Sequence, residues 1–392
     1  MRARRRRRKK RNIGIIEVMC IIAALLVVLL LIAYAVFSHL DQKKAQVSGN
    51  IVDRQEQTVD RTQYVDELLK DFHVGKTDYL VTDKKFALSG RWYQTIIDGT
   101  ACYNTVTQGA MVYFQIRGTD GFDIQFIDRT TLETPYFAYI IDDGEPVRQT
   151  VSENHVALPD ADEHNVTLVM DGMNEREDKW QGEIGFAFSN IDCGQGEMNG
   201  FIPKEKRVLF IGDSITEGCM TLGDEAVSTY NSATHSVSWY TAEALHAEPY
   251  FLGYGGSGIG ESGSFNTTAG ALDYLSANRR VSAEDYPDCD LIILNVGTND
   301  YNTDDRNFLR GYESVLDKLH EHYPNVSIVC VIPYNQTHAK QIREIVSGHK
   351  WAYLMETEGI TFDSNDGIHP NDSGARKIAG LMVDFISENG IF

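Results

Sequence analysis

The sequence predicts an α/β domain preceded by an all-β sandwich domain and an N-terminal transmembrane helix. Residues 18–37 form a run of twenty uncharged residues after a basic cluster. Short runs rich in Val, Ile, Tyr and Phe fill the middle of the chain, and apolar runs alternate with helical patterns after Arg207. The predicted segments are a cytoplasmic basic segment (1–12), a transmembrane signal-anchor helix (13–38), a stalk (39–85), a β-sandwich domain (86–200) and an α/β domain (201–392).

The apolar run near the N-terminus has the length of a membrane span. Twenty helical residues extend about 30 Å, the thickness of the hydrocarbon core. The positive-inside rule then places the basic segment in the cytoplasm and everything after His39 outside the cell membrane. A signal peptide cleaved near Ala33-Tyr34-Ala35 is the alternative, and the protein would then be secreted.

The charge of the chain is strongly divided. Its net charge is −20, yet residues 2–11 hold nine Lys or Arg and no acid. From residue 41 onward, 27 basic residues face 55 acidic ones. Such an acidic surface repels nucleic acid and anionic polymers unless it has a local basic groove, so no nucleic-acid partner is expected and a neutral or acetyl-masked substrate is favoured.

The cysteines follow neither a disulfide nor a zinc pattern. Outside the apolar run they are odd in number and contain no C-x-x-C pair, so free thiols are expected and a single bridge is left open. They are Cys102, Cys193, Cys219, Cys289 and Cys330.

The middle of the chain predicts a β-sandwich. Residues 111–116, 122–127 and 136–141 are short runs of β-favouring residues, separated by glycine-containing turn groups. Strands at this spacing are typical of sandwiches. No concentration of catalytic residue types stands out in this region.

The C-terminal half predicts a parallel sheet covered by helices on both faces. Residues 208–211, 291–294 and 327–332 are apolar runs, and apolar residues at helical spacing between Ile378 and Ile386 give one helix an apolar face. Ligands of such sheets bind at the carboxyl ends of the strands, where the residue types that carry chemistry are found here.

Two of these strand-end blocks suggest nucleophilic catalysis. Ser214 follows a strand and Gly212, which places its hydroxyl on a tight turn, although an ordinary helix N-cap has the same pattern. Asp366 lies three residues before His369 across a glycine turn, so its carboxylate can reach Nδ1 of the ring. The other ring nitrogen is then free to accept a proton from a serine. A surface histidine is the alternative.

Two further blocks suggest hydrogen-bond donors for an oxyanion. The glycine-rich loop at residues 253–260 brings backbone amides close to a ligand, but an ordinary turn has the same composition. It lacks the spacing and the lysine of a phosphate-binding P-loop. Asn299, after the strand at 291–294, can direct its amide into the cleft. An Asx turn is the alternative.

Taken in order, the four blocks resemble those of the SGNH, or GDSL, hydrolases. The matching residues are Gly212-Asp213-Ser214, a glycine of the second block, Gly297-Thr298-Asn299-Asp300 and Asp366…His369-Pro370. The resemblance implies a flavodoxin-like three-layer α/β/α fold, with Ser214 as nucleophile, His369 as base and Asp366 as the third triad member. It also implies an oxyanion hole of Ser214, Gly256 and Asn299, with Gly255 and Gly258 as alternatives to Gly256, and no metal or organic cofactor.

A narrower resemblance includes the sandwich. Ser89-Gly-Arg-Trp92, Tyr139-Ile-Ile-Asp-Asp-Gly144 and the Glu163-His164 pair before a Ser214 block are similar to carbohydrate esterase family 2, in which a jelly-roll domain precedes the SGNH domain. Some members of that family lack the triad carboxylate, whereas this chain has Asp366. A backbone carbonyl in that role is the alternative.

The expected function is a membrane-anchored extracellular serine esterase that removes acetyl or other short acyl groups from polysaccharide. Two other functions remain open: a cell-surface O-acetyltransferase, and a carbohydrate-binding protein with an inactive hydrolase domain. Four aromatic residues have the chemistry to stack on sugar rings, with burial in the core as the default for each. They are Trp239, Tyr254, Tyr301 and Trp351.

Overall fold

The structure, a computed structural model, describes residues 80–82, 85–201, 203–204 and 206–392, which fall within one compact unit. The predicted cytoplasmic segment, the transmembrane helix and most of the stalk lie outside the described residues. Within the described ranges, no helix combines the length and apolar character that a membrane span requires.

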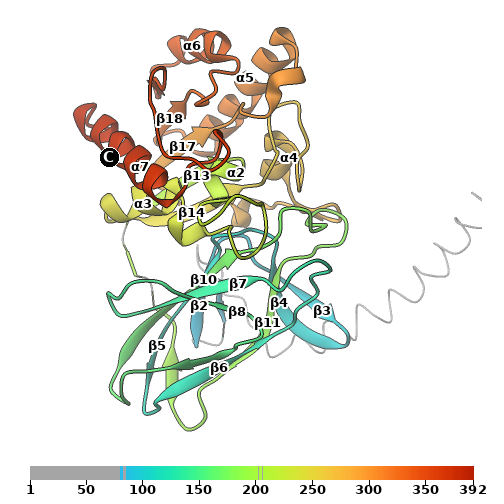
Figure 1. Ribbon diagram of the computed structural model, residues 1–392, viewed down its shortest axis with the longest axis vertical. Helices are drawn as coiled ribbons and strands as arrows, with labels where there is room; N and C mark the ends of the chain where they lie inside the picture. Colours follow the sequence, from blue (N-terminus) through green and yellow to red (C-terminus); the bar gives the residue numbers. More distant parts are fainter. Residues whose placement is uncertain (1–79, 83–84, 202, 205) are drawn as a thin grey trace, which may run out of the picture. The chain divides into compact units, whose positions relative to one another are not determined.

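The N-terminal part is a sandwich of two antiparallel sheets (Figure 1). Strands predicted at 111–116, 122–127 and 136–141 are confirmed, and β1 adds a strand in the range predicted as stalk. The first sheet contains, in order, β1 (Leu80–Thr82), β2 (Phe86–Ser89), β5 (Met111–Arg117), β10 (His164–Gly172), β7 (Tyr136–Ile141) and β8 (Val147–Thr150), with β12 (Glu197–Asn199) paired to β5. The second contains β3 (Tyr93–Ile97), β4 (Thr100–Thr105), β11 (Phe186–Asp192), β6 (Gly121–Phe126) and β9 (His155–Ala157).

Alternating inward side chains of both sheets form the sandwich core. Phe114 of β5 and Phe122 of β6 meet edge to face, with ring centroids 5.1 Å apart. Two motifs noted in the sequence, residues 139–144 and Glu163-His164, lie in contact in the sandwich. His164 Nδ1 is 2.9 Å from Asp142 Oδ2. All five described cysteines are free thiols, as expected.

The C-terminal part is built on a parallel sheet with the order β14 (Glu248–Gly253), β13 (Arg207–Gly212), β17 (Leu291–Asn295), β18 (Ser327–Val331) and β19 (Ala352–Met355). Numbered along this domain, the order is 2-1-3-4-5, which is the flavodoxin-like arrangement. The strand order therefore reverses between β13 and β17, and ligands of such folds bind at that point.

Helices cover both faces of this sheet (Figure 1). Val208 and Phe210 of β13 pack in one apolar cluster with α3 (Val237–Ala244) and α7 (Asp372–Glu388). Leu209 and Ile211 pack in another with α5 (Asp305–His322) and α6 (Ala339–Ser347). The smaller elements are α2 (Ser214–Glu217), α4 (Thr268–Asp273), η1 (Ala233–His235), η2 (Ala283–Asp285), η3 (Asp300–Asn302), β15 (Tyr274–Ser276) and β16 (Arg279–Arg280).

The sandwich packs directly against the α/β domain. Met111, Tyr113 and Val169 of its first sheet share a buried apolar cluster with Trp239 and Phe251 of the other domain. Gly109 is required at this contact, because a Cβ there would lie 2.4 Å from the Phe251 ring.

Candidate active site

The nucleophile turn links β13 to α2 at the point where the strand order reverses. Asp213 caps the short helix, with its Oδ1 accepting a 3.0 Å hydrogen bond from the Ile215 amide. Gly212 allows the tight turn, since a Cβ there would lie 2.0 Å from Thr216 Oγ1. Ser214 is thereby fixed at the carboxyl end of the sheet, with 6% of its surface exposed.

Three residues predicted from the sequence form a hydrogen-bonded chain at this turn. His369 Nε2 lies 2.8 Å from Ser214 Oγ, and His369 Nδ1 lies 2.7 Å from Asp366 Oδ2. The other Asp366 oxygen accepts the Ile368 and His369 amides at 2.9 and 2.8 Å. Partial burial alone raises the pKa of Asp366, but these hydrogen bonds from His369 and Ile368 outweigh it and lower that pKa to about 2. The carboxylate is therefore charged at neutral pH and holds the imidazole by Nδ1.

The glycine loop and the asparagine block are connected to each other. Asn299 Nδ2 donates a 2.9 Å hydrogen bond to the Ser257 carbonyl, and this bond fixes the orientation of the Asn299 side-chain amide. The buried Asp300 carboxylate accepts the Ile259 and Gly260 amides at 2.8 and 2.7 Å. These bonds hold the glycine loop beside the end of β17.

The structure distinguishes the three loop glycines that were considered as backbone donors to the oxyanion. The Gly258 amide donates to the Glu261 carbonyl at 3.0 Å and is not available to a substrate. Gly255 is buried against Glu175, whose Oε2 would lie 1.6 Å from a Cβ at that position. Gly256 is solvent-exposed and has a left-handed φ of +72°. Gly256 therefore stays the predicted donor among the three glycines.

The sandwich loop between β10 and β11 packs against the nucleophile turn. This contact was not predicted from the sequence. Lys179 Nζ lies 3.1 Å from Glu217 Oε2 and 3.8 Å from Glu175 Oε1, and both Lys179 and Glu217 are fully buried. Burial, followed by the nearby Glu175, raises the pKa of Glu217 well above its usual range. Gln108 donates to the Glu217 carbonyl at 2.6 Å and accepts the Met173 amide at 3.0 Å.

The four aromatic residues considered as sugar-stacking candidates differ in exposure. Trp239 and Tyr254 are buried in the core, and Trp351 packs against the core and stacks on His320 with ring centroids 4.0 Å apart. Tyr301 is 76% exposed and lies two residues after Asn299. Tyr301 is thus the one of the four that is open to a ligand.

A serine, imidazole and carboxylate connected in this way, beside an oriented amide, can carry out acyl transfer. Residues 210–377 match the GDSL-like Lipase/Acylhydrolase family. The GDSL-like domain contains all four blocks recognised in the sequence, and the predicted resemblance is confirmed. No curated protein matches the chain.

Solved structures share the two-domain fold of sandwich and GDSL-like domain. A family two carbohydrate esterase from Clostridium thermocellum, in complex with cellohexaose, is 19% identical over 78% of this chain and 100% of its own, with a TM-score of 0.62. The family two carbohydrate esterase of Cellvibrio japonicus is 17% identical over 79% and 96%, with a TM-score of 0.64. An acetyl xylan esterase from the rumen bacterium Butyrivibrio proteoclasticus is 18% identical over 80% and 97%, with a TM-score of 0.62.

Proposed function

We propose that the protein is a serine esterase that removes acetyl or other short acyl groups from polysaccharide. The observation that carries the proposal is the hydrogen-bonded chain from Ser214 through His369 to Asp366. The fold shared with family two carbohydrate esterases supports a carbohydrate ester as the substrate. The exposed Tyr301 ring, two residues after Asn299 in the chain, offers a surface on which a sugar can stack.

The proposed reaction is a two-step acyl transfer. His369 takes the proton of Ser214 as the hydroxyl oxygen attacks the ester carbonyl, and Asp366 stabilises the imidazolium that forms. The amides of Ser214 and Gly256 and the Asn299 side chain stabilise the oxyanion, each donor contributing about 3–4 kcal/mol to the transition state. The alcohol leaves with the proton from His369. Water then attacks the acyl-enzyme with the same residues in reversed roles and releases the carboxylic acid.

The decisive test is Ser214→Ala, assayed with p-nitrophenyl acetate and with acetylated polysaccharides scored for acetate release. We expect kcat to fall by about 10⁴–10⁶ while the fold is retained, because the nucleophile is lost. Ser152→Ala, an exposed serine in the sandwich, is the matched control and leaves kcat unchanged. Wild-type turnover by Ser214→Ala refutes the proposal.

Two measurements separate the other functions. A sugar acceptor that diverts the acyl group from water into a new ester identifies a transferase. A fluorophosphonate probe that fails to label Ser214 in the folded protein identifies a binding protein without catalysis.

We further propose that a transmembrane helix at residues 13–38 anchors the protein to the cell membrane, with the esterase outside. The basic cluster at residues 2–11 followed by the apolar run supports this topology. Carbonate extraction of membranes containing the full chain tests it. Retention in the membrane pellet and digestion of the esterase by external protease are expected, whereas a shortened, soluble product shows signal cleavage.

A further inference from the structure

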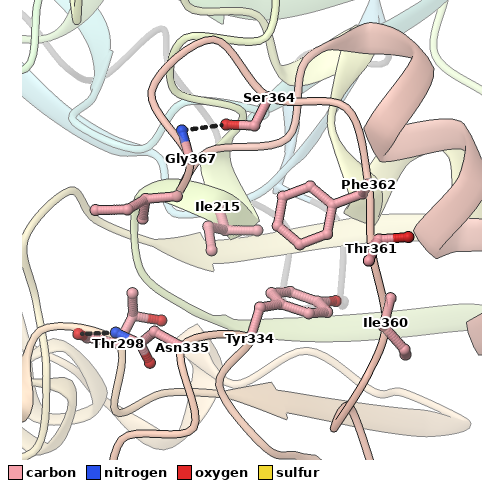
Figure 2. A pocket seen from close by; sticks show the side chains of 10 residues that line it. Ile215, Thr298, Tyr334, Asn335, Ile360, Thr361, Phe362, Ser364 and Gly367 are labelled. Carbon is pink, nitrogen blue, oxygen red and sulfur yellow. Dashed lines mark hydrogen bonds between the residues drawn. The ribbon is translucent and has the colours of Figure 1, made fainter.

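The loop before α7, residues 360–371, carries the acid–base pair Asp366 and His369 and is called the histidine loop below. Its own hydrogen bonds hold it in shape. Ser364 Oγ accepts the Gly367 amide at 2.8 Å (Figure 2), and Asp366 Oδ1 accepts the His369 amide at 2.8 Å. These bonds fix the two members of the pair relative to each other, but they do not fix the loop relative to the nucleophile.

Packing beneath the histidine loop is incomplete. A cavity of about 270 Å³ lies between this loop, which contributes Phe362 and Ile368, and the opposite wall, which includes Ile215 and Tyr334 (Figure 2). A loop above a cavity has fewer packing contacts that resist its displacement. Hydrogen bonds to other parts of the chain therefore matter for its position.

Hydrogen bonds of this kind lead from the histidine loop to a second irregular segment, residues 219–231, which we call the strap. Asn365 Nδ2, just before the acid–base pair, donates to the Gly223 carbonyl at 2.6 Å. The Asp372 amide, where the loop enters α7, donates to the Thr221 carbonyl at 2.9 Å. The strap thus binds the histidine loop on both sides of the acid–base pair.

The first half of the strap, which receives these bonds, is itself tied to the second half. The Leu222 amide donates to the Tyr230 carbonyl at 3.0 Å, and the Met220 amide donates to Asn231 Oδ1 at 2.9 Å. Gly223 lies against the Tyr230 ring, where a Cβ would be 2.2 Å from the nearest ring atom. The carbonyls that hold the histidine loop are therefore fixed by the second half of the strap.

The second half of the strap is bound to the sandwich. The fully buried Asn231 donates through Nδ2 to the Met173 carbonyl at 2.8 Å. The Arg148 guanidinium donates to the carbonyls of Asn231 and Thr229 at 2.8 and 3.1 Å, and it pairs with the buried carboxylate of Asp171. A continuous set of hydrogen bonds therefore runs from the sandwich through the strap to the histidine loop.

We propose that Asn365 and Arg148 are positioning residues, through which the sandwich sets the distance between His369 and Ser214. The inference rests on the esterase function proposed above. Asn365 holds the histidine loop on the strap, and Arg148 holds the strap on the sandwich, so neither acts by touching the substrate. A displacement of about 1 Å in an active site can lower the rate about 100-fold, because the reacting groups lose their alignment.

Asn365→Ala tests the bond between the histidine loop and the strap. Because Asn365 is exposed, the urea midpoint stays within error of wild type, whereas kcat for p-nitrophenyl acetate falls about 10- to 100-fold at an unchanged KM. Asn365→Asp keeps the size of the side chain but cannot donate, and it loses at least as much. Asn389→Ala is the matched control and keeps wild-type kcat, because this exposed asparagine also donates to a carbonyl, at 2.8 Å, but at the C-terminal end of α7.

A double-mutant cycle tests the path through the strap. Arg148→Lys keeps a cation beside Asp171 but loses the planar fork that reaches several carbonyls, so kcat falls at an unchanged KM. Combined with Asn365→Ala, it lowers kcat by less than the product of the two single effects, since the histidine loop is already detached from the strap. If Arg148→Lys does not fold, Glu133→Ala replaces it, because Glu133 Oε2 accepts the strap amide of Ser228 at 2.9 Å.

The opposite results are equally definite. Wild-type kcat in Asn365→Ala, a raised KM at wild-type kcat, or a fall in kcat that only follows a loss of folded protein overturns the positioning role while the esterase function stands. Single effects that multiply in the double variant overturn the path through the strap. Absence of ester hydrolysis by the wild-type protein refutes the esterase function itself.

Discussion

Asp213→Asn is expected to make the protein more stable at neutral pH and less active. Asp213 is fully buried at the nucleophile turn, and burial raises the pKa of its carboxyl to about 6. In the unfolded chain an aspartate has a pKa of about 3.9. Because the folded pKa is higher, the contribution of Asp213 to stability is fully present below pH 4. It is lost as the pH rises through 6.

The size of the effect follows from the two pKa values. A difference of about two units corresponds to about 3 kcal/mol, which wild-type protein loses between pH 4 and pH 7 at this one residue. Asparagine carries no charge and still accepts the Ile215 amide as an N-cap. Asp213→Asn therefore exceeds wild type by up to about 3 kcal/mol at pH 8, and the difference closes toward pH 4.

Urea unfolding of both proteins from pH 4 to pH 8 measures the difference between their free energies of unfolding. The other titrating groups are the same in both proteins, so their contributions cancel in this difference. A difference that stays constant with pH, or a variant less stable than wild type at pH 8, refutes the reasoning. The negative charge of Asp213 also interacts favourably with protonated His369. We therefore expect a lower kcat for the variant, which would show that this buried charge is kept for catalysis at a cost in stability.

Three further predictions concern the supports of the site. Lys179→Met lowers the free energy of unfolding by about 3–5 kcal/mol, because the buried Glu217 and the partly buried Glu175 lose their cation, and adding Glu217→Gln recovers part of it. Urea denaturation measures both, and equal stability of Lys179→Met and wild type contradicts the prediction. Asp366→Asn lowers kcat for p-nitrophenyl acetate about 10⁴-fold without unfolding the protein, since the imidazole loses its orienting partner; a loss below tenfold argues for a backbone carbonyl in that role. Gly255→Ala lowers both kcat and thermal stability, because its Cβ would meet a carboxylate of the sandwich loop. Gly380→Ala, where nothing lies within 4 Å, is the control and gains up to about 1 kcal/mol.

The elements that position Ser214, His369 and Asp366 could be predicted because their signals are local. The strands before Ser214 and Asn299 are short apolar runs that end in Gly212 and Asn295. Asp366 and His369 are three residues apart, so one turn is enough to bring them together. Only the closure of the 155-residue separation between Ser214 and His369 depended on the resemblance to a family.

The supports of the site could not be predicted, because their partners are set by tertiary packing. Lys179 lies in a loop without periodicity or motif, and its burial against Glu217 follows only from how the sandwich docks. Asp300 stood in a recognised block, yet nothing local indicated that it accepts two amides of the glycine loop. The exposure of Tyr301, in contrast to the burial of Tyr254, likewise depends on the surrounding fold.

The contact between Lys179 and Glu217 has a consequence for how the two domains can be handled. Excising the sandwich would remove the cation beneath the nucleophile turn and uncover the apolar side chains of Trp239 and Phe251. A truncated catalytic half would then carry the Glu217 carboxyl without its cation next to the reactive serine, together with an exposed apolar surface. A sandwich exchanged by engineering or evolution therefore needs a loop that places a lysine against Glu217. Substrate-binding modules are better grafted elsewhere on the molecule.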